Sequence, residues 1–307
     1  MRVLITGATG TIGLAIADAL AGRGDEIVAL SRDPERAGRV LGAHAEVHGW
    51  ADPTASPPPR AALATVDAVV HLLGEPVAQR WTEEAKRRIR DSRVLGTRQL
   101  VSALADLPAG SGPRALVSQS ATGYYGPRDD TALDEQAAPG EDFLAGVVVA
   151  WEREALAAAP RLRVAVTRTG VVLSPSGGAL GKMLPFFRLG IGGPVAGGRQ
   201  YVPWIHLDDV VGALLHCLDH DGAAGPVNVT APTPVTNTEL AHALGQVLGR
   251  PAVLPVPGMA VRLLYGEMAE MVTTGQRAIP ARLQQLDYRF RHPALEPALR
   301  DVLRRGG

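Results

Sequence analysis

Hydroxyl and phenol side chains concentrate in one stretch of this sequence, residues 119–126. Ser120, Thr122, Tyr124 and Tyr125 lie within it, together with two glycines. Such groups can donate or accept protons, and the stretch follows an apolar run that is typical of a strand. Ligands of α/β proteins bind at the carboxyl ends of parallel strands. We therefore take Ser120, Tyr124 and Tyr125 as candidate catalytic residues.

A second stretch, residues 2–32, has the spacing of a dinucleotide-binding turn. A short apolar run ends at Gly7, glycines recur at Gly10 and Gly13, and an apolar-periodic segment follows. Gly7 would let the chain turn off a strand, Gly10 would leave room for a pyrophosphate, and Gly13 would let a helix pack close to the sheet. Glycine also collects in structural turns, which is the alternative interpretation.

The residues after the second predicted strand indicate which nucleotide would bind. A free ribose 2′-hydroxyl usually meets an acidic residue there, whereas a 2′-phosphate requires positive charge. This chain has Ser31 and Arg32 at that place, and its first carboxylate, Asp33, comes one residue later. An arginine can form a forked pair with a phosphate, so the sequence favours NADP(H) over NAD. The alternative is a solvated arginine.

The composition restricts the kinds of partner. The chain has 307 residues, with 31 basic and 31 acidic side chains, so bulk charge predicts neither nucleic-acid nor membrane binding. No apolar run approaches the ~20 residues of a membrane span, and the N-terminus is typical of a strand and not of a signal peptide. The single cysteine, Cys217, gives no intrachain disulfide and no metal site. We expect a cytoplasmic protein with a small-molecule substrate.

Alternating helix and strand patterns predict the elements that would position these residues. Strands are predicted at residues 3–5, 26–30, 45–48, 68–73, 115–118 and 163–169, and helices at 14–20, 33–41, 80–104, 143–158, 209–220 and 237–248. Leu72, Leu73 and Gly74 would end the fourth strand beside the cofactor, and His71 fits a buried core histidine. Residues 177–198, dense in glycine, are predicted to form a substrate-facing loop.

The fold class predicted from this order is α/β, a doubly wound parallel Rossmann sheet with a small C-terminal α/β substrate lobe. We assign residues 1–172 and 205–225 to the nucleotide-binding Rossmann domain. Residues 173–204 and 226–307 would form the small substrate-binding lobe. The stretch from Trp204 to Asp209 is interpreted as structural.

Taken together, these motifs resemble those of the extended and atypical short-chain dehydrogenase/reductases. The resemblance is to the epimerase-like subgroup that ends in a small C-terminal domain of unknown function. It covers essentially the whole chain and is carried by the glycine turn and by Ser31-Arg32, 67–76, 80–82, 92–97, 120–126, Trp151-Glu152, 168–178, 204–209, Gly266-Glu267 and 275–280.

The resemblance implies an NADP(H) site and an oxidoreductase or epimerase activity. Arg93 stands where sugar epimerases of this fold usually have an asparagine that faces the cofactor, and Tyr125 would have a supporting role more than a catalytic one. Relatives also pair through the two long helices, which implies a homodimer. The cofactor residues implied are Gly7, Thr9, Gly10, Thr11, Ile12, Ser31, Arg32, Leu72, Leu73, Gly74, Arg93 and Val172.

One departure from the family concerns catalysis. Relatives use a serine or threonine with Tyr-x-x-x-Lys, and Ser120 fits the serine position, but no Tyr-x-x-x-Lys occurs in this chain. Two hypotheses follow. The first is an enzyme that has rebuilt its acid/base from Ser120 and the nearby tyrosines, with Glu75, His206 or Lys182 as helpers. The second is a catalytically weak NADP(H)-binding sensor or regulatory protein.

Overall fold

The computed structural model describes residues 1–108, 110–174 and 177–306. Its centre is a parallel sheet of seven strands in the order β11-β7-β5-β4-β1-β2-β3. These strands are β1 (Arg2–Thr6), β2 (Glu26–Ser31), β3 (Ala45–Gly49), β4 (Ala68–His71), β5 (Ala115–Ala121), β7 (Arg163–Thr169) and β11 (Gly225–Val229). The strand order reverses between β1 and β4, which is where such sheets bind their ligands. The predicted doubly wound α/β fold is confirmed.

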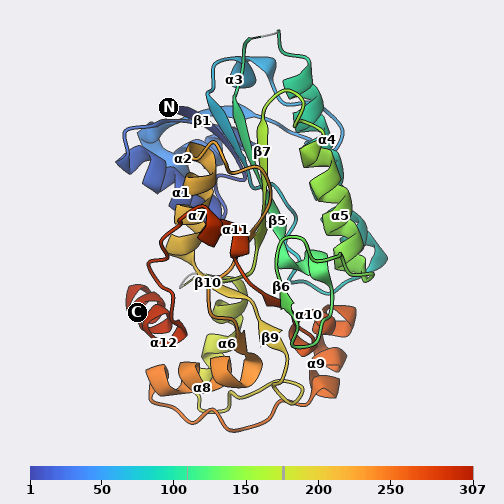
Figure 1. Cartoon of the computed structure of the whole chain (residues 1–307), viewed down its shortest axis with the longest axis vertical. Helices are drawn as coiled ribbons and strands as arrows, with labels where there is room; N and C mark the ends of the chain where they lie inside the picture. Colours follow the sequence, from blue (N-terminus) through green and yellow to red (C-terminus); the bar gives the residue numbers. More distant parts are fainter. Residues whose placement is uncertain (109, 175–176, 307) are drawn as a thin grey trace.

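Helices cover both faces of this sheet (Figure 1). One face packs against α1 (Thr11–Gly22) and α7 (Leu207–Asp219), and the other against α3 (Arg60–Ala64), α4 (Glu83–Ala105) and α5 (Phe143–Leu156). Because both faces are covered, the strands are continuous apolar runs and not alternating ones. The α2 helix (Pro34–Leu41) and the 3₁₀ turns η1 (Gly42–His44) and η2 (Thr122–Tyr125) lie in the connections.

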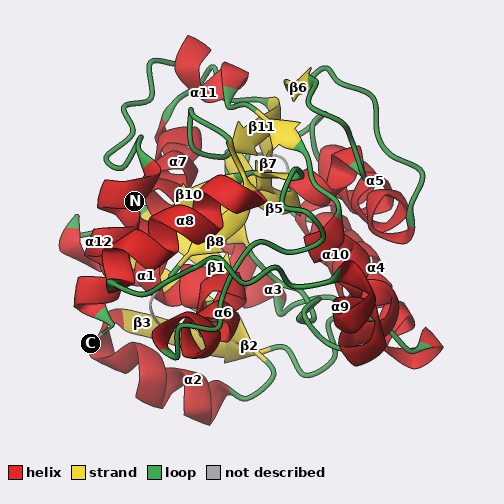
Figure 2. Ribbon diagram, turned by 90° about the horizontal axis from the view of Figure 1, so that it is seen from below, coloured by secondary structure: helices red, strands yellow, loops and turns green. Residues whose placement is uncertain are grey.

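Most of the remaining elements form a smaller group below the carboxyl ends of the strands (Figures 1 and 2). The strands are β6 (Ala132–Leu133), β8 (Val171–Leu173), β9 (Tyr201–Val202), β10 (Trp204–His206), β12 (Val235–Thr236) and β13 (Arg277–Ala278). The helices are α6 (Gly178–Arg188), α8 (Asn237–Leu248), α9 (Gly258–Tyr265), η3 (Gly266–Ala269), α10 (Glu270–Thr273), α11 (Ala281–Gln285) and α12 (Leu295–Arg305). Side chains of α6, α8 and α12 share a separate apolar core.

Two of these helices differ from the sequence prediction. The glycine-rich stretch predicted as a loop contains α6, because Leu180, Leu184 and Phe187 bury one helical face. The C-terminal segment, beyond the last helix named in the prediction, contains α12, whose Leu299 and Val302 pack against α8. In both segments tertiary burial outweighs a weak local signal.

One sheet strand extends beyond the expected domain boundary. We expected the Rossmann domain to end at residue 225, but β11 continues to Val229 and pairs with β7 along its length. The division into two domains otherwise stays a prediction. Within the described residues, no helix combines the length and the apolar character needed to cross a membrane.

Candidate functional site

The glycine turn connects β1 to α1 at the point where the strand order reverses. Gly7 has φ +68°, and a Cβ atom on it would lie 2.7 Å from the Leu72 carbonyl oxygen. A Cβ atom on Gly13 would lie 2.2 Å from the Gly7 oxygen, so only glycine lets this helix approach so closely. Gly10 has only one neighbour within 4 Å of such an atom, at 3.4 Å. The three glycines therefore have the geometry of a dinucleotide turn.

The start of α1 is suited to an anion. Its N-cap, Gly10, supplies no side-chain hydrogen bond, and the first turn contains no acidic residue. The first N–H groups of the helix are thus left for a ligand and carry the positive end of the helix dipole. Thr9 and Thr11 are exposed and Ile12 is half-buried. Gly177, just before α6, lies close to the start of α1: a Cβ atom on Gly177 would be 3.6 Å from Thr11 Oγ1.

At the end of β2 the charges are arranged as a 2′-phosphate would require. The Asp33 carboxylate caps α2 by accepting the Arg36 N–H at 3.0 Å. The Ser31 hydroxyl accepts the Asp33 N–H at 3.1 Å and donates to its carbonyl oxygen at 2.9 Å. Arg32 is exposed and makes no ion pair or hydrogen bond with any residue that the structure describes. Its guanidinium is therefore free to pair with an anion.

The segment after β4 forms the opposite side of the turn. The Leu72 N–H donates to the carbonyl and hydroxyl oxygens of Thr6, which joins β4 to the end of β1. Leu72 and Leu73 are half-buried, Gly74 is exposed, and Val172 is half-buried in β8. These positions agree with the predicted cofactor neighbours, although their contact with a cofactor stays a prediction.

Arg93 lies beneath this segment in a largely buried position. Its Nη1 donates to the carbonyl oxygens of Glu75 and Ile89 at 2.9 and 3.1 Å, and its guanidinium lies 5.2 Å from the centre of the Trp151 ring. A Cβ atom on Gly74 would lie 3.0 Å from that guanidinium. Desolvation lowers the pKa of Arg93 to about 10, which leaves it charged at neutral pH. It thus places a positive charge beside the carboxyl end of β4.

The predicted catalytic hydroxyls differ in how they are engaged. Ser120 is buried and donates to Glu152 Oε1 at 2.5 Å. The Tyr125 hydroxyl is fully buried, lies 2.7 Å from Asn228 Oδ1 and 2.9 Å from the Asp134 oxygen, and accepts from Arg168. Desolvation is the main reason that the pKa of Tyr125 is raised to about 12.

Tyr124 is the more accessible of the two tyrosines. It is half-buried, and its hydroxyl forms no hydrogen bond within the described part of the chain. Its ring instead lies 3.4 Å from the Arg168 guanidinium carbon. The structure therefore brings the three predicted residues together but leaves Tyr124 as the one whose polar group can meet a ligand.

Glu152 and Arg168 connect these hydroxyls, and no role was predicted for either residue from the sequence. Both side chains are buried, at 5% and 2% exposure. A buried charge needs a partner of opposite sign. Arg168 lies in a predicted strand and Glu152 in a predicted helix, so the pairing that such charges need once they are buried was the available signal.

The proposed helper residues have other partners. The Lys182 ammonium donates to the Ala78 carbonyl oxygen at 2.6 Å, which ties α6 to the segment before α4. The Glu75 carboxylate accepts from Gln79 at 3.2 Å and lies 3.6 Å from Arg88. None of these contacts prepares a group for proton transfer.

His71 and Cys217 are core residues, as predicted. His71 is fully buried between Thr6 Oγ1 at 2.8 Å and Thr97 Oγ1 at 2.9 Å, and desolvation lowers its pKa to about 4. Cys217 is also fully buried, and desolvation raises its pKa to about 12. Both groups are therefore neutral at physiological pH.

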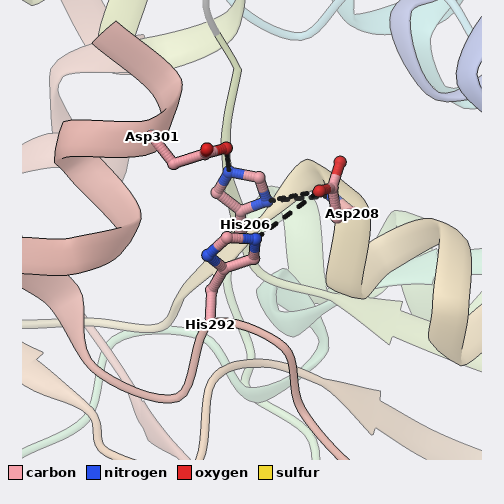
Figure 3. A group of neighbouring side chains, drawn as sticks. All are labelled: His206, Asp208, His292 and Asp301. Atoms are coloured by element: carbon pink, nitrogen blue, oxygen red, sulfur yellow. Dashed lines mark hydrogen bonds and ion pairs between the residues drawn. The ribbon is translucent and has the colours of Figure 1, made fainter. Parts of the chain in front are cut away.

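A second polar cluster lies where α12 meets the start of α7 (Figure 3). His206, Asp208, His292 and Asp301 offer ligand atoms that all lie within 4.8 Å of one another, so the set could hold a cation. The sequence analysis missed this cluster, because its members are up to 95 residues apart and no metal motif connects them. The hydrogen bonds within the cluster indicate whether these residues bind a metal or have a structural role.

These hydrogen bonds favour a structural role over metal binding. His206 Nδ1 accepts the Asp208 N–H at 3.0 Å, so in the neutral ring Nε2 carries the proton and has no lone pair for a metal. Nε2 lies 3.3 Å from Asp301 Oδ2. Arg305 already neutralises both carboxylates, at 2.9 Å from Asp208 and 2.8 Å from Asp301. The cluster fastens α12 to the sheet domain.

Two family models match this chain. The model described as the NAD dependent epimerase/dehydratase family matches residues 3–230, and a domain of unknown function, DUF1731, matches residues 256–302. The chain belongs to the NAD-dependent epimerase/dehydratase family. This family match covers the central sheet and the glycine turn, and the second domain covers α9 to most of α12.

Individual members of this family are similar over nearly the full chain. An epimerase family protein from Mycobacterium tuberculosis is 40% identical, over 97% of this chain and 96% of its own. The chloroplastic SDR39U1 homolog from Arabidopsis thaliana is 38% identical, over 99% of this chain and 87% of its own. The crystal structure of human epimerase family protein SDR39U1 with NADPH is 36% identical, with a TM-score of 0.87 and 99% of each chain covered.

Proposed function

We propose that this member of the epimerase family binds NADP(H) and uses it to transfer a hydride to or from a small carbonyl or alcohol compound. The free Arg32 guanidinium beside the glycine turn carries the cofactor assignment, because a 2′-phosphate pairs with such a group. The solved structure of the human relative holds NADPH, which supports the same assignment. A nucleotide sugar is one substrate class of the right chemistry.

The residues present fit the cofactor at each of its parts. Free N–H groups of α1 would hold the pyrophosphate, and Arg32 would hold the 2′-phosphate, with Ser31 lining that place while its hydroxyl bonds to Asp33. Leu72, Leu73 and Val172 are half-buried and offer backbone and apolar surface beside the glycine turn. When bound, the nicotinamide supplies or accepts the hydride. The proton that accompanies it must come from a side chain beside the substrate, and Tyr124 has the free hydroxyl.

The test is substrate-dependent oxidation of NADPH by the purified protein, screened over carbonyl compounds and nucleotide sugars. We expect turnover that is lost in a Ser120→Ala/Tyr124→Phe double variant. A Tyr265→Phe variant, whose ring is exposed in α9, is the matched control and should keep the wild-type rate. Unchanged turnover in the double variant would remove both residues from the mechanism.

The second candidate function is an NADP(H) sensor without efficient chemistry. This candidate is favoured because the hydroxyls of Ser120 and Tyr125 already form hydrogen bonds inside the protein, to Glu152 and Asn228. Tight NADPH binding with no turnover across the whole screen supports this candidate, and robust turnover of any one compound excludes it.

We also propose a homodimer formed through α4 and α5. These two helices pack side by side along one edge of the molecule (Figure 1), and Arg98 pairs with Glu154 at 2.8 Å between them. Val149 is 39% exposed on α5 and would lie within the interface. Light scattering should give the mass of a dimer for the wild type and of a monomer for Val149→Glu; a wild-type monomer contradicts the proposal.

A further inference from the structure

The α5 helix has two buried side chains one helical turn apart that face the sheet. Val148 and Glu152 are four residues apart on α5, and both are buried against the sheet, at 3% and 5% exposure. No Tyr-x-x-x-Lys occurs in the chain, so any acid/base couple must be built from other side chains.

The sheet register places a cation beside Ser120 and Glu152. Ser120 on β5 is the direct neighbour of Arg168 on β7. Arg168 Nε lies 2.8 Å from Glu152 Oε1, and Nη2 lies 2.9 Å from Oε2, which is a forked pair. Desolvation alone would lower the pKa of Arg168, but the hydrogen bond and charge of Glu152 outweigh it and raise that pKa. Arg168 is therefore a fixed, permanent charge.

The remaining donor of Arg168 fixes the plane of its guanidinium. Nη1 lies 3.1 Å from the Tyr125 hydroxyl and 3.1 Å from the Glu135 carbonyl oxygen. All three nitrogens are thus engaged, and one face of the group lies 3.4 Å from the centre of the Tyr124 ring. A cation stacked on an aromatic ring stabilises negative charge in that ring. Arg168 therefore contacts both tyrosines, but of the two only Tyr124 has a hydroxyl without a hydrogen bond among the described residues.

We propose that Tyr124 and Arg168 form the acid/base couple of this protein, in place of the missing tyrosine and lysine. Tyr124 Oη would touch the substrate oxygen, and Glu152 is a positioning residue that holds Arg168 under the ring. This inference rests on the proposed NADP(H)-dependent function. It identifies the substrate group beside Tyr124 as a carbonyl in reduction or a secondary alcohol in oxidation.

In the proposed step the proton comes from Tyr124 and the hydride from the cofactor. In reduction the bound nicotinamide supplies a hydride, with its electron pair, to the carbonyl carbon. The Tyr124 O–H bond breaks, its proton passes to the carbonyl oxygen, and an alcohol forms. The negative charge left on Tyr124 Oη is stabilised by Arg168 until solvent returns a proton to this half-buried group. Oxidation is the reverse of this sequence.

The couple can be tested without a substrate, by nitration with tetranitromethane. This reagent attacks the ionised form of tyrosine, and mass spectrometry of peptides assigns the rate to each residue. We expect Tyr124 to react in the wild type and to react roughly 3- to 30-fold more slowly in Arg168→Lys, because lysine lacks the planar group that stacks. Tyr201, whose ring lies 5.2 Å from Arg277, is the internal control and should keep its rate.

Two further variants keep the test decisive. Glu152→Gln/Arg168→Gln removes both buried charges together and should slow Tyr124 in the same way, so it replaces Arg168→Lys if that variant unfolds. Glu154→Gln changes a partly exposed carboxylate on the same helix and should leave the rate unchanged. The proposal is overturned if Tyr124 reacts equally fast in the folded charge variant, or if it is inert in the wild type while Tyr201 reacts.

The outcomes separate this proposal from the proposed function. If the wild type fails to bind NADPH in calorimetry, the proposed function falls while a slowed nitration rate still demonstrates the Tyr124–Arg168 contact. If NADPH binds normally and the nitration rate is unchanged in the variants, the couple falls and the cofactor assignment stands. Tyr124→Phe should bind NADPH with wild-type affinity in either case.

Discussion

Removing the Glu152 carboxylate should destabilise the protein far more than removing an exposed carboxylate does. Glu152 accepts three charge-assisted hydrogen bonds, one from Ser120 and two from Arg168, and both charged side chains are almost fully buried. Glu152→Leu would leave the Arg168 cation buried without a counter-ion. Breaking such a pair costs about 3–5 kcal/mol. At roughly 2 °C per kcal/mol for a chain of this size, the melting temperature should fall by about 6–10 °C.

A double-mutant cycle distinguishes a lost pair from a lost side chain. Glu152→Leu/Arg168→Met removes both charges, and replacing a whole buried pair by apolar groups is often close to neutral. We therefore expect the double variant to recover most of the stability lost in Glu152→Leu. Chemical denaturation of the four proteins gives the coupling energy, and Glu154→Leu, which breaks the more exposed pair with Arg98, should cost about 1 kcal/mol or less. A loss below about 1 kcal/mol in Glu152→Leu, or a double variant as unstable as the sum of the single ones, refutes the reasoning.

Three other predictions concern the frame around the site. Burial depresses the pKa of His71 to about 4 in the folded protein, so the neutral ring contributes its full stability above pH 6.5. The free energy of unfolding should therefore fall by up to ~3 kcal/mol between pH 6.5 and pH 4. Denaturant titrations at each pH should show that His71→Gln removes this pH-dependent component. Gly13→Ala should destabilise the fold by about 1–3 kcal/mol and abolish NADPH binding in calorimetry, whereas Gly22→Ala, with open space around it in the same helix, should do neither. The Asp209 carboxylate accepts hydrogen bonds from two backbone N–H groups of the C-terminal segment. Asp209→Ala should therefore speed proteolytic cleavage within residues 288–306. An unchanged cleavage rate would show that other contacts hold this segment.

The sequence predicts the parts of this molecule that depend on local spacing. The glycine turn is such a part, because Gly7, Gly10 and Gly13 each meet a steric demand set within a few residues. The free arginine after β2 is another, since its surroundings are fixed by the adjacent Asp33 cap. The order of apolar runs likewise fixes the parallel sheet.

Other parts depend on which distant residues meet, and spacing gives no information about that. Arg168 faces Ser120 only through the register of β5 on β7, and Glu152 reaches it from a helix. The His206 cluster forms only when α12 folds back onto α7. Residue spacing likewise did not separate Tyr124 from Tyr125, whose hydroxyls have opposite surroundings; only the family resemblance gave Tyr125 the supporting role.

The central claim is that the Arg32 guanidinium recognises the 2′-phosphate of NADP(H). Calorimetric titration of the wild type and of Arg32→Glu with NADPH and with NADH tests it most directly. The account predicts that the wild type prefers NADPH and that the variant loses roughly 10- to 100-fold in affinity for NADPH, about 1.5–3 kcal/mol, while its affinity for NADH changes little. Equal binding of the two cofactors by the wild type, or an unchanged affinity of Arg32→Glu for NADPH, would contradict it.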